Sequence, residues 1–485
     1  MKKIVLLVTL LFILTSCVNE TNDYNNDHDK AYNVPATVLL TNAEKALSDQ
    51  MTTPSINTNI FRFTSQYWTE TQYITESRYR ISTRKIADNH WTILYRNVIS
   101  NLESAKSLVN SEVKSDGFTQ TDWDKQQKNK IAILEILEVY SFQILVDTFG
   151  DIPYTDAVSP GVILPKYDDD TSIYPKLITR LNASIANLDS SGNSFATGEI
   201  IYNGNVQNWI LFANSLKLKI GINLADVNNA LAKSTIESAF AAGVITANSN
   251  NAKFAYLSIS PNYNPIYDNL IASNRNDFVP ASPIIDDMNT LNDPRRTVYF
   301  TTYNGNYVGG VYGYANTYEN FSHVSDLIKK PEAPGILMEA TEVNFILAEA
   351  AARGYSVGDT ASSYYNQAIQ SSFDFWGISS LASAYLANPD VAYNTAPGAT
   401  YKEKIGRQAW IALFNRGFES WNTWRRLDFP NLQAPANAYP EAYGKVPVRY
   451  TYPINEQTVN GNNWNAASGA IGGDKLTTKI FWDVN

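Results

Sequence analysis

The regular spacing of apolar residues constrains the fold of this chain most strongly. Between Gln127 and Phe149, apolar side chains recur every three or four residues, which places them along one face of a helix. Gly150 ends this pattern, and Pro153 prevents the helix from resuming. The sequence therefore predicts a long amphipathic helix that ends at Gly150.

The same spacing recurs along much of the chain and predicts a mainly α fold. Alternating apolar and polar residues, as in a half-buried strand, are limited to short runs at 253–259 and 297–301. Further helices are predicted at 91–102, 173–188, 206–224, 340–375 and 403–426. Asp88 or Asn89 is the expected cap of the first of these. The expected class is mainly α, with few short strands and long irregular connections.

Residues 341–377 have the pattern of a helix pair. One helix ends at Gly354, and the next carries Ala361, Tyr365 and Ala368 at the spacing found in the second helix of a tetratricopeptide repeat. Small residues there let paired helices approach closely. Plain antiparallel packing of helices explains the pattern about as well. We interpret the scaffold as a set of tetratricopeptide-like helix pairs.

A loop-rich segment interrupts the helical blocks. Residues 251–320 hold nine of the 30 tyrosines, about twice an even share, together with many Asn, Gly and Pro residues. A long irregular segment that is dense in aromatic residues is typical of a binding loop rather than of a disordered one. Anchoring of the loops to the helical body is the other interpretation of each single ring.

The first seventeen residues have the pattern of a lipoprotein signal. Lys2 and Lys3 precede an apolar run of eleven residues, whose helix would reach about 16 Å and could not cross a bilayer core of about 30 Å. The run ends in Leu-Thr-Ser-Cys17, which resembles the lipobox in which a cysteine is acylated. An ordinary secretory signal with a chance cysteine is the alternative. We expect a signal peptide at 1–16, a lipidated polar leash at 17–30 and a single domain at 31–485.

Charge and cysteine content exclude several classes of protein. Removal of residues 1–16 takes away two lysines and moves the net charge from −9 to −11, which argues against nucleic acid as a partner. Cys17 is the one cysteine, so a disulfide framework and a thiolate metal site are both excluded. The stability of the fold must come from a large core.

Recognisable catalytic and metal-binding patterns are absent from the sequence. The three histidines share no helix face, and no nucleophile elbow, His-Glu-x-x-His or phosphate-binding glycine loop is present. Asp168, Asp169 and Asp170 could form a calcium loop, but a helix-cap region before Thr171 explains them more simply. Paired carboxylates of a glycoside hydrolase leave no sequence signature. We expect no catalytic residue, no metal and no cofactor.

Several distinctive motifs are spread over the whole mature chain. They are 145–157 (LVDTFGDIPYTDA), 209–218 (WILFANSLKL), 292–295 (NDPR), 348–354 (AEAAARG), 408–414 (QAWIALF) with 417–426 (GFESWNTWRR), 446–449 (VPVR) with Tyr452, Pro453 and Glu456, and Trp482 with Asp483. In this order they resemble the SusD/RagB family of nutrient-binding outer-membrane lipoproteins of Bacteroidetes, in its SusD-like, starch-binding-associated branch. The resemblance implies a helical body and a loop-rich insertion at about 251–335 that carries the ligand surface.

The resemblance also implies a function. Such proteins lie at the cell surface, anchored by lipid to the outer membrane, and act as lids on a SusC-like TonB-dependent β-barrel importer. They capture an oligosaccharide, or in some branches a peptide, and pass it on without catalysis. It implies that Arg425 and Arg426 support packing or docking rather than ligand binding. A surface glycoside hydrolase and a scaffold that binds only protein are the alternatives.

Ligand residues are not transferred from the family and are instead selected on physical grounds. Aromatic side chains in expected loops, with amide or charged neighbours, suit the apolar faces and hydroxyl groups of sugars. The candidates are Trp68, Tyr73, Arg78, Tyr263, Asn264, Arg275, Asp277, Tyr307 and Tyr312.

Overall fold

The computed structural model describes residues 34–485, and residues 36–485 form one compact unit. Helices dominate this unit and strands are few and short, so the predicted class is confirmed. Cys17 and the proposed leash at 17–30 lie outside the described residues. Among the described helices, none combines the length and the apolar composition needed to cross a membrane.

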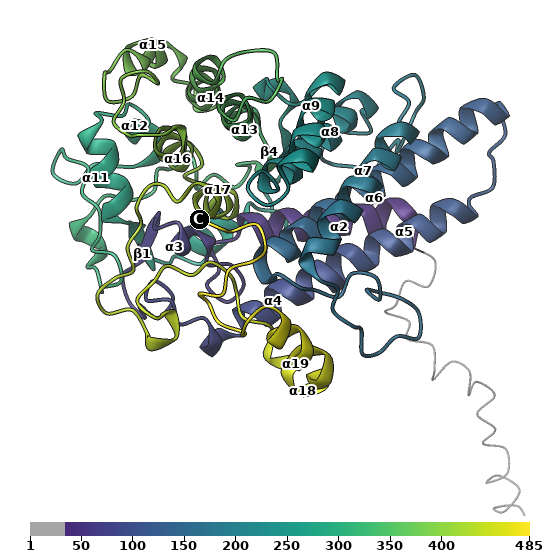
Figure 1. The fold of residues 1–485 in the computed structure, drawn as a ribbon, viewed down its shortest axis with the longest axis horizontal. Coiled ribbons are helices and arrows are strands. Elements are labelled where there is room, and N and C mark those ends of the chain that lie inside the picture. The colour runs from purple at the N-terminus through teal and green to yellow at the C-terminus, as the bar shows by residue number, and fades with distance from the viewer. Residues whose placement is uncertain (1–33) are drawn as a thin grey trace, which may run out of the picture. The chain divides into compact units, whose positions relative to one another are not determined.

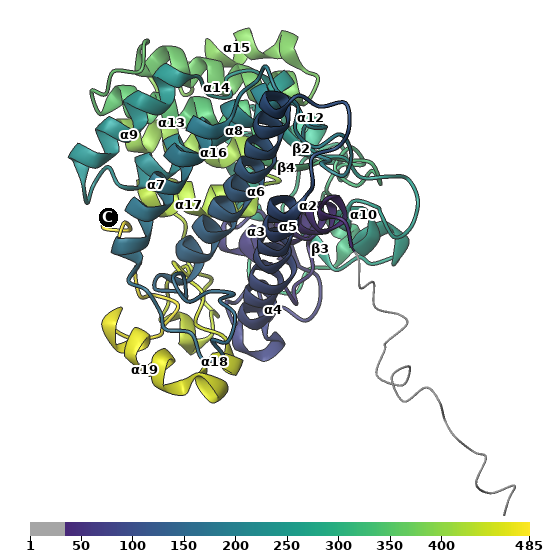
Figure 2. The same cartoon turned by 90° about the vertical axis from the view of Figure 1, so that its right-hand side faces the viewer.

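Long helices packed against one another form the body of the protein. Helices that are neighbours in the sequence pack together, notably α6 with α7, α8 with α9 and α13 with α14 (Figures 1 and 2). The helices of this body are α2 (Ala36–Thr52), α4 (Ile86–Thr92), α5 (Ser100–Ser111), α6 (Gln120–Phe149), α7 (Asp170–Asn187), α8 (Val206–Asn223), α9 (Asn229–Ala242), α13 (Ala340–Ala352), α14 (Ala361–Phe375), α16 (Tyr401–Ala412) and α17 (Gly417–Leu427). The predicted pairing within 341–377 is confirmed by α13 and α14.

Local chemistry explains where several of these helices begin and end. The side chain of Thr119 caps α6, that of Asp169 caps α7 and that of Asn205 caps α8, each by accepting a backbone N–H of the first turn. Gly150 ends α6 with a φ of +82°, a conformation that favours glycine. The predicted end at Gly150 is confirmed, whereas α6 begins seven residues earlier than the expected start at Gln127.

Two predicted helix boundaries are wrong. The helix expected to be capped at Asp88 or Asn89 begins at Ile86 and continues through a π-helical stretch into α5. Asp88 instead accepts the backbone N–H groups of Ile454 and Asn455, at 3.1 and 3.0 Å, at the start of another helix. The predicted 403–426 segment is two helices, because the chain turns between α16 and α17.

Short strands tie the loop-rich part together. The antiparallel pair of β1 (Trp68–Glu70) and β3 (Phe278–Pro280) joins the N-terminal segment to the insertion, and β2 (Ala252–Phe254) pairs with β4 (Gly335–Met338). The strand expected at 253–259 is therefore only β2, and the one expected at 297–301 is wrong. Its residues form the helical turn α12 (Arg296–Tyr299), whose first N–H groups bond back to 293–295.

A buried cluster of charges joins several helices of the body. Arg416, between α16 and α17, lies 3.3 Å from Glu339, 2.6 Å from Glu342 and 3.3 Å from Glu419. Lys219 of α8 lies 3.0 Å from Glu342 and 3.1 Å from Glu419. All five side chains are buried. Burial raises the pKa of Glu339, whereas the two cations hold that of Glu342 below its usual value despite burial.

The arginines near the end of α17 also belong to the body. Arg426 bonds to Glu349 at 2.9 Å, and the guanidinium of Arg425 lies 3.6 Å from the ring centre of Trp421 and 4.6 Å from that of Trp482. Both arginines are buried, and burial lowers the pKa of Arg425 to about 10. The expectation that they support packing is confirmed.

Candidate functional site

Three hollows lie along the surface that the insertion builds, which we call the insertion face. The largest, the α2 hollow, measures about 530 Å³ and lies between α2 and residues 260–268. The short helix α10 (Pro265–Tyr267) contributes to the lining of the α2 hollow, and the turn after it contributes Leu270 and Ile271 to one of two smaller hollows. Those measure about 340 and 160 Å³ and share Asn276 and Tyr318, so we call them the Tyr318 hollows.

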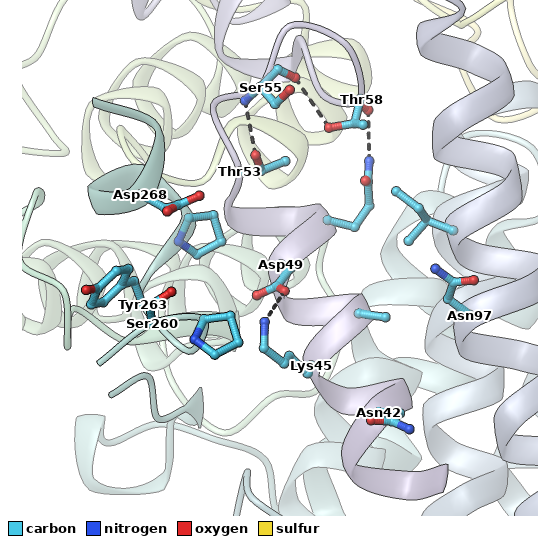
Figure 3. Close-up of a pocket in the computed structure, with 15 residues that line it drawn as sticks. Asn42, Lys45, Asp49, Thr53, Ser55, Thr58, Asn97, Ser260, Tyr263 and Asp268 are labelled. Atoms are coloured by element: carbon cyan, nitrogen blue, oxygen red, sulfur yellow. Dashed lines mark hydrogen bonds and ion pairs between the residues drawn. The ribbon is translucent and has the colours of Figure 1, made fainter. Parts of the chain in front are cut away.

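The α2 hollow is lined mainly by polar residues, and Tyr263 is the aromatic residue in its lining. Lys45 and Asp49 of α2 form an ion pair at 2.5 Å, facing Tyr263 and Asp268 of the insertion (Figure 3). The Tyr263 ring is half-buried and packs edge-on against that of Tyr267, with ring centres 4.9 Å apart. Further amide and hydroxyl groups line this hollow, from Asn42, Gln50, Thr53, Ser55, Thr58, Asn97 and Ser260.

Tyr318 is the aromatic centre of the insertion face. Its ring stacks on His323 with the ring centres 3.8 Å apart and the planes 12° from parallel. Burial and the nearby carboxylates Asp326 and Glu319 raise the pKa of Tyr318, so its hydroxyl stays protonated and can donate a hydrogen bond. Residues 71 and 72, Asn274, Arg275 and Asn276, and residues 315–319 complete the polar lining of the two hollows.

The loop at 71–79 borders the Tyr318 hollows. The backbone N–H of Thr71 donates to Asp277 at 2.9 Å, and that of Asn316 donates to Thr71 at 3.1 Å. This loop carries Tyr73, whose side chain is 76% exposed and whose φ is +53°. A tyrosine in the left-handed region is strained by about 1 kcal/mol, and such strain clusters at functional sites.

A pair of buried carboxyl groups holds this loop. Glu70 accepts the backbone N–H of Ser77 at 2.9 Å and its hydroxyl at 2.7 Å, which closes the loop that contains Tyr73. Glu76 accepts a bond from Arg84 at 2.7 Å. One oxygen of each glutamate is buried without a partner among the described residues. Burial, and then the neighbouring Glu76, raise the pKa of Glu70 to about 9, so a proton remains on this pair.

Three sequence candidates are buried, and their expected position on exposed loops is wrong. Trp68 is 1% exposed because it lies in β1, where its ring packs on Phe278. Tyr312 is 7% exposed and donates to the backbone oxygen of Phe63 at 2.6 Å. Asn264 is 1% exposed because its side chain caps α10. None of the three offers a free face to a ligand here.

The other candidates lie at the surface but in different places. Tyr263 lines the α2 hollow, and Arg275 lines the smaller Tyr318 hollow with Asp277 3.9 Å away. Arg78 is engaged elsewhere, since it donates to the Asn437 backbone oxygen at 2.7 Å and lies 4.3 Å from the Tyr439 ring centre. Tyr307 is half-buried beneath the guanidinium of Arg296 and lines none of the three hollows.

Sequence reasoning missed several residues of this face as individual candidates. Tyr318 was counted in the tyrosine-rich segment but not selected, and Asn276 lies between the selected Arg275 and Asp277. Gln72 lies beside the selected Tyr73. The clustering of tyrosines with Asn and charged residues in the sequence could have indicated these positions. The sequence does not reveal that loops over 200 residues apart come into contact to form the hollows.

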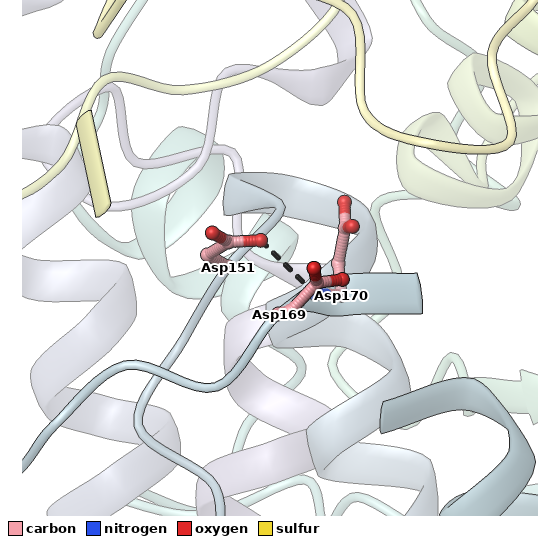
Figure 4. A group of neighbouring side chains, drawn as sticks. All are labelled: Asp151, Asp169 and Asp170. Carbon is pink, nitrogen blue, oxygen red and sulfur yellow. Dashed lines mark hydrogen bonds between the residues drawn. The ribbon is translucent and has the colours of Figure 1, made fainter. Parts of the chain in front are cut away.

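One cluster of carboxylates among the described residues is close-packed enough to be considered as a metal site. Oxygens of Asp151, Asp169 and Asp170 lie within 4.8 Å of one another (Figure 4). Asp151 accepts the backbone N–H of Asp170 at 3.0 Å, and Asp170 accepts that of Phe481 at 3.2 Å. Burial raises the pKa of Asp151 to about 6 and that of Asp170 to about 7. The cap of α7 is Asp169, so the predicted helix-cap region is confirmed.

Comparison with known proteins identifies the class of protein that this helical body and loop-built face define. Residues 27–453 match the SusD-like family described as "starch-binding associating with outer membrane". No curated protein matches the chain. A chitin-binding protein has a TM-score of 0.79 at 24% identity, covering 93% of this chain and 100% of its own.

Other solved structures extend the similarity. A chitin-binding SusD homologue from Flavobacterium johnsoniae has a TM-score of 0.77 at 25% identity, covering 92% of this chain and 99% of its own. A SusD homologue from Bacteroides uniformis has a TM-score of 0.75 at 28% identity, with the same coverage. The chain belongs to the SusD-like family, so the resemblance seen in the sequence is confirmed. It is accordingly a non-catalytic carbohydrate-binding protein of an outer-membrane-associated family.

Proposed function

We propose that this protein captures an oligosaccharide on its insertion face and passes it to a SusC-like TonB-dependent importer. The observation that carries the proposal is Tyr318, a stacked ring that lines both hollows beside amide and charged groups. The smaller hollow also has apolar side chains in its lining, from Leu270, Ile271, Phe278 and Val324. Sugar rings present apolar C–H faces and polar edges, and this combination matches such a lining. Tyr73, next to Gln72 of the larger Tyr318 hollow, adds an exposed ring.

Capture on this face requires no chemistry. Arg275, Asn276 and Gln72 can hydrogen-bond sugar hydroxyl groups at the edges of the rings. The polar contacts are exposed to water, so each contributes modestly, and binding should be reversible. Reversible binding suits a protein that must release its ligand to a transporter.

The ligand class is narrowed by the relatives. The family is described as starch-binding, and the homologue from Flavobacterium johnsoniae is chitin-binding. We therefore expect glucose-based or N-acetylglucosamine-based oligosaccharides to bind, and a peptide ligand is the alternative.

Affinity electrophoresis and calorimetry with starch, chitin oligosaccharides, other glycans and peptides test this proposal. We expect binding of at least one glycan, a marked loss of affinity in Tyr318→Ala, and no release of reducing ends. Binding of peptides alone would replace the oligosaccharide with the alternative ligand. Glycan binding that is unchanged in Tyr318→Ala would place the site elsewhere.

Attachment and delivery form the second half of the proposal. We propose that Cys17 is acylated and that the leash holds the domain at the outer membrane, facing the cell exterior. A Cys17→Ala variant should leave the membrane fraction. The wild-type protein should co-purify with a TonB-dependent β-barrel, and failure of both results would contradict this half of the proposal.

A further inference from the structure

A fourth hollow lies away from the insertion face. It measures about 300 Å³ and lies between the start of α4 and the helices α18 (Ile454–Val459) and α19 (Gly461–Ala470). Figure 2 shows α18 and α19 at the lower left, whereas β3 and α10 of the insertion lie to the right. Its lining has no residue in common with the three hollows of the insertion face. We call it the Trp464 hollow.

Trp464 is the aromatic wall of this hollow, and a buried ion pair fixes its ring. The indole N–H donates to Oδ2 of Asp474 at 3.2 Å, while Oδ1 of Asp474 accepts from Arg449 at 2.8 Å and from the Tyr452 N–H at 3.0 Å. The half-buried ring packs on the core with one part and lines the hollow with another. Among the described residues, no other aromatic ring and no cation stacks on Trp464.

Polar groups around Trp464 are available to a ligand. The side chains of Lys85, Thr451 and Gln457 line the hollow and form no hydrogen bond with any other described residue. Lys85 has a φ of +54°, a strained conformation that recurs at binding sites. Asp88, in contrast, is already engaged by the first N–H groups of α18.

A second aromatic ring belongs to a turn that contacts residues of the hollow. Tyr443 is 59% exposed with a φ of +51°, and Lys475, next to Asp474, lies 5.6 Å from its ring centre. Glu441 in the same turn accepts the Ile81 N–H at 3.0 Å and the Ser82 hydroxyl at 3.2 Å. These bonds fasten the turn that carries Tyr443 to Ile81 and Ser82, two residues that line the hollow.

We propose that the Trp464 hollow is a second saccharide-binding site, which takes a neutral pyranose unit of the glycan that the insertion face captures. The inference rests on the proposed function. The Trp464 ring would stack on the sugar face, while Gln457, Thr451 and Lys85 would bind hydroxyl groups. A neutral sugar fits because the charge of Lys85 is balanced by the carboxylate of Asp88 in the same lining, whose partners among the described residues are uncharged backbone N–H groups. The volume is at the lower end of the range for small-molecule sites, which suits one or two sugar units.

Two separate sites have a consequence for polymers. A glycan long enough to reach both sites binds the second one as an intramolecular step, which raises its overall affinity without any new contact. A short oligosaccharide binds each site independently, so the second site does not raise its affinity. The second site should therefore matter more for polysaccharide than for short oligosaccharide.

Binding measurements on the purified full-length protein test the inference, with the glycan that the wild type binds. In a Tyr73→Ala, Tyr318→Ala background, a short oligosaccharide should still bind weakly, as detected by saturation-transfer NMR, and adding Trp464→Ala should abolish that signal. In the otherwise wild-type protein, Trp464→Ala should lower polysaccharide affinity about tenfold. Gln457→Ala, which changes an exposed side chain, should lower polysaccharide affinity about threefold. Trp464→Phe should retain part of the binding.

Matched controls separate the outcomes. Val459→Ala changes an exposed side chain on α18 outside the hollow and should leave all binding unchanged. If the wild type binds a glycan through Tyr318 while both Trp464→Ala and Gln457→Ala bind it normally, the second site is overturned and the proposed function stands. If the wild type binds no glycan, both are overturned.

Discussion

The helical body and the insertion face use the same kinds of residue for different purposes. In the body, Arg416 is buried among three glutamates and one lysine, which join α8, α13 and α17. On the insertion face, Arg275 is over half exposed and lies 3.9 Å from a single exposed partner, Asp277. A buried charge must be paired to be tolerated, whereas an exposed pair contributes little to stability and stays free for a ligand.

The tyrosines show the same contrast. In the body, Tyr140 donates to the Leu337 backbone oxygen at 2.8 Å and is completely buried. On the insertion face, Tyr73 is mostly exposed in a strained conformation. The difference suggests that the body is built for stability and the face for binding, and substitutions in each region can break or sharpen this distinction.

The largest effect is expected for Arg416→Ala. Removal of this guanidinium leaves Glu339, Glu342 and Glu419 buried with only Lys219 to compensate them, which should lower the free energy of unfolding by about 3–5 kcal/mol. Chemical denaturation measures this loss. A loss below about 1 kcal/mol would show that the cluster is not structural.

The next effect concerns pH and the Glu70–Glu76 pair. Because the folded-state pKa of Glu70 is raised to about 9 from 4.5, its contribution to stability is fully present below pH 4.5, where the folded and unfolded states both hold the proton. That contribution is lost as the pH rises toward 9, because the unfolded state gives up its proton first. Glu70→Gln cannot titrate and can donate to Glu76 in place of the shared proton. The variant should therefore gain stability relative to wild type between pH 5 and pH 8, on the order of 1–3 kcal/mol.

Denaturation at the two pH values tests this expectation, with the exposed Glu319→Gln as a control. An equal difference between Glu70→Gln and wild type at pH 5 and pH 8 would mean that Glu70 does not hold a proton in the folded protein.

A smaller effect is expected for Tyr73→Ala. Loss of one exposed stacking ring should weaken glycan binding about tenfold, or about 1.4 kcal/mol. Stability should be almost unchanged, because the side chain is 76% exposed and alanine keeps the same backbone strain at φ +53°. Calorimetry and thermal unfolding measure the two quantities. Weakened binding accompanied by a large loss of stability would count against a role in the site.

The smallest effect is expected for Arg275→Ala, the counterpart of Arg416→Ala on the insertion face. Stability should change by less than about 0.5 kcal/mol, and glycan affinity should fall about threefold. If the two arginine variants lost equal stability, the distinction between body and face would fail.

The sequence predicted the helical body well because its pattern is local. The helix that ends at Gly150 and the pair at 341–377 follow from spacing and from glycine, which depend on neighbours in the chain. The boundary at Asp88 failed because the groups that it binds belong to α18, over 360 residues away. Trp68 was misplaced for the same reason, since its burial depends on β3.

The most direct test of the account is a crystal structure with the best-binding oligosaccharide. We predict density for the sugar in the Tyr318 hollows, with a ring stacked on Tyr318 or Tyr73 and hydroxyl groups near Asn276 and Arg275. Density confined to the helical body, with the insertion face empty, would contradict the central claim that this face captures the glycan.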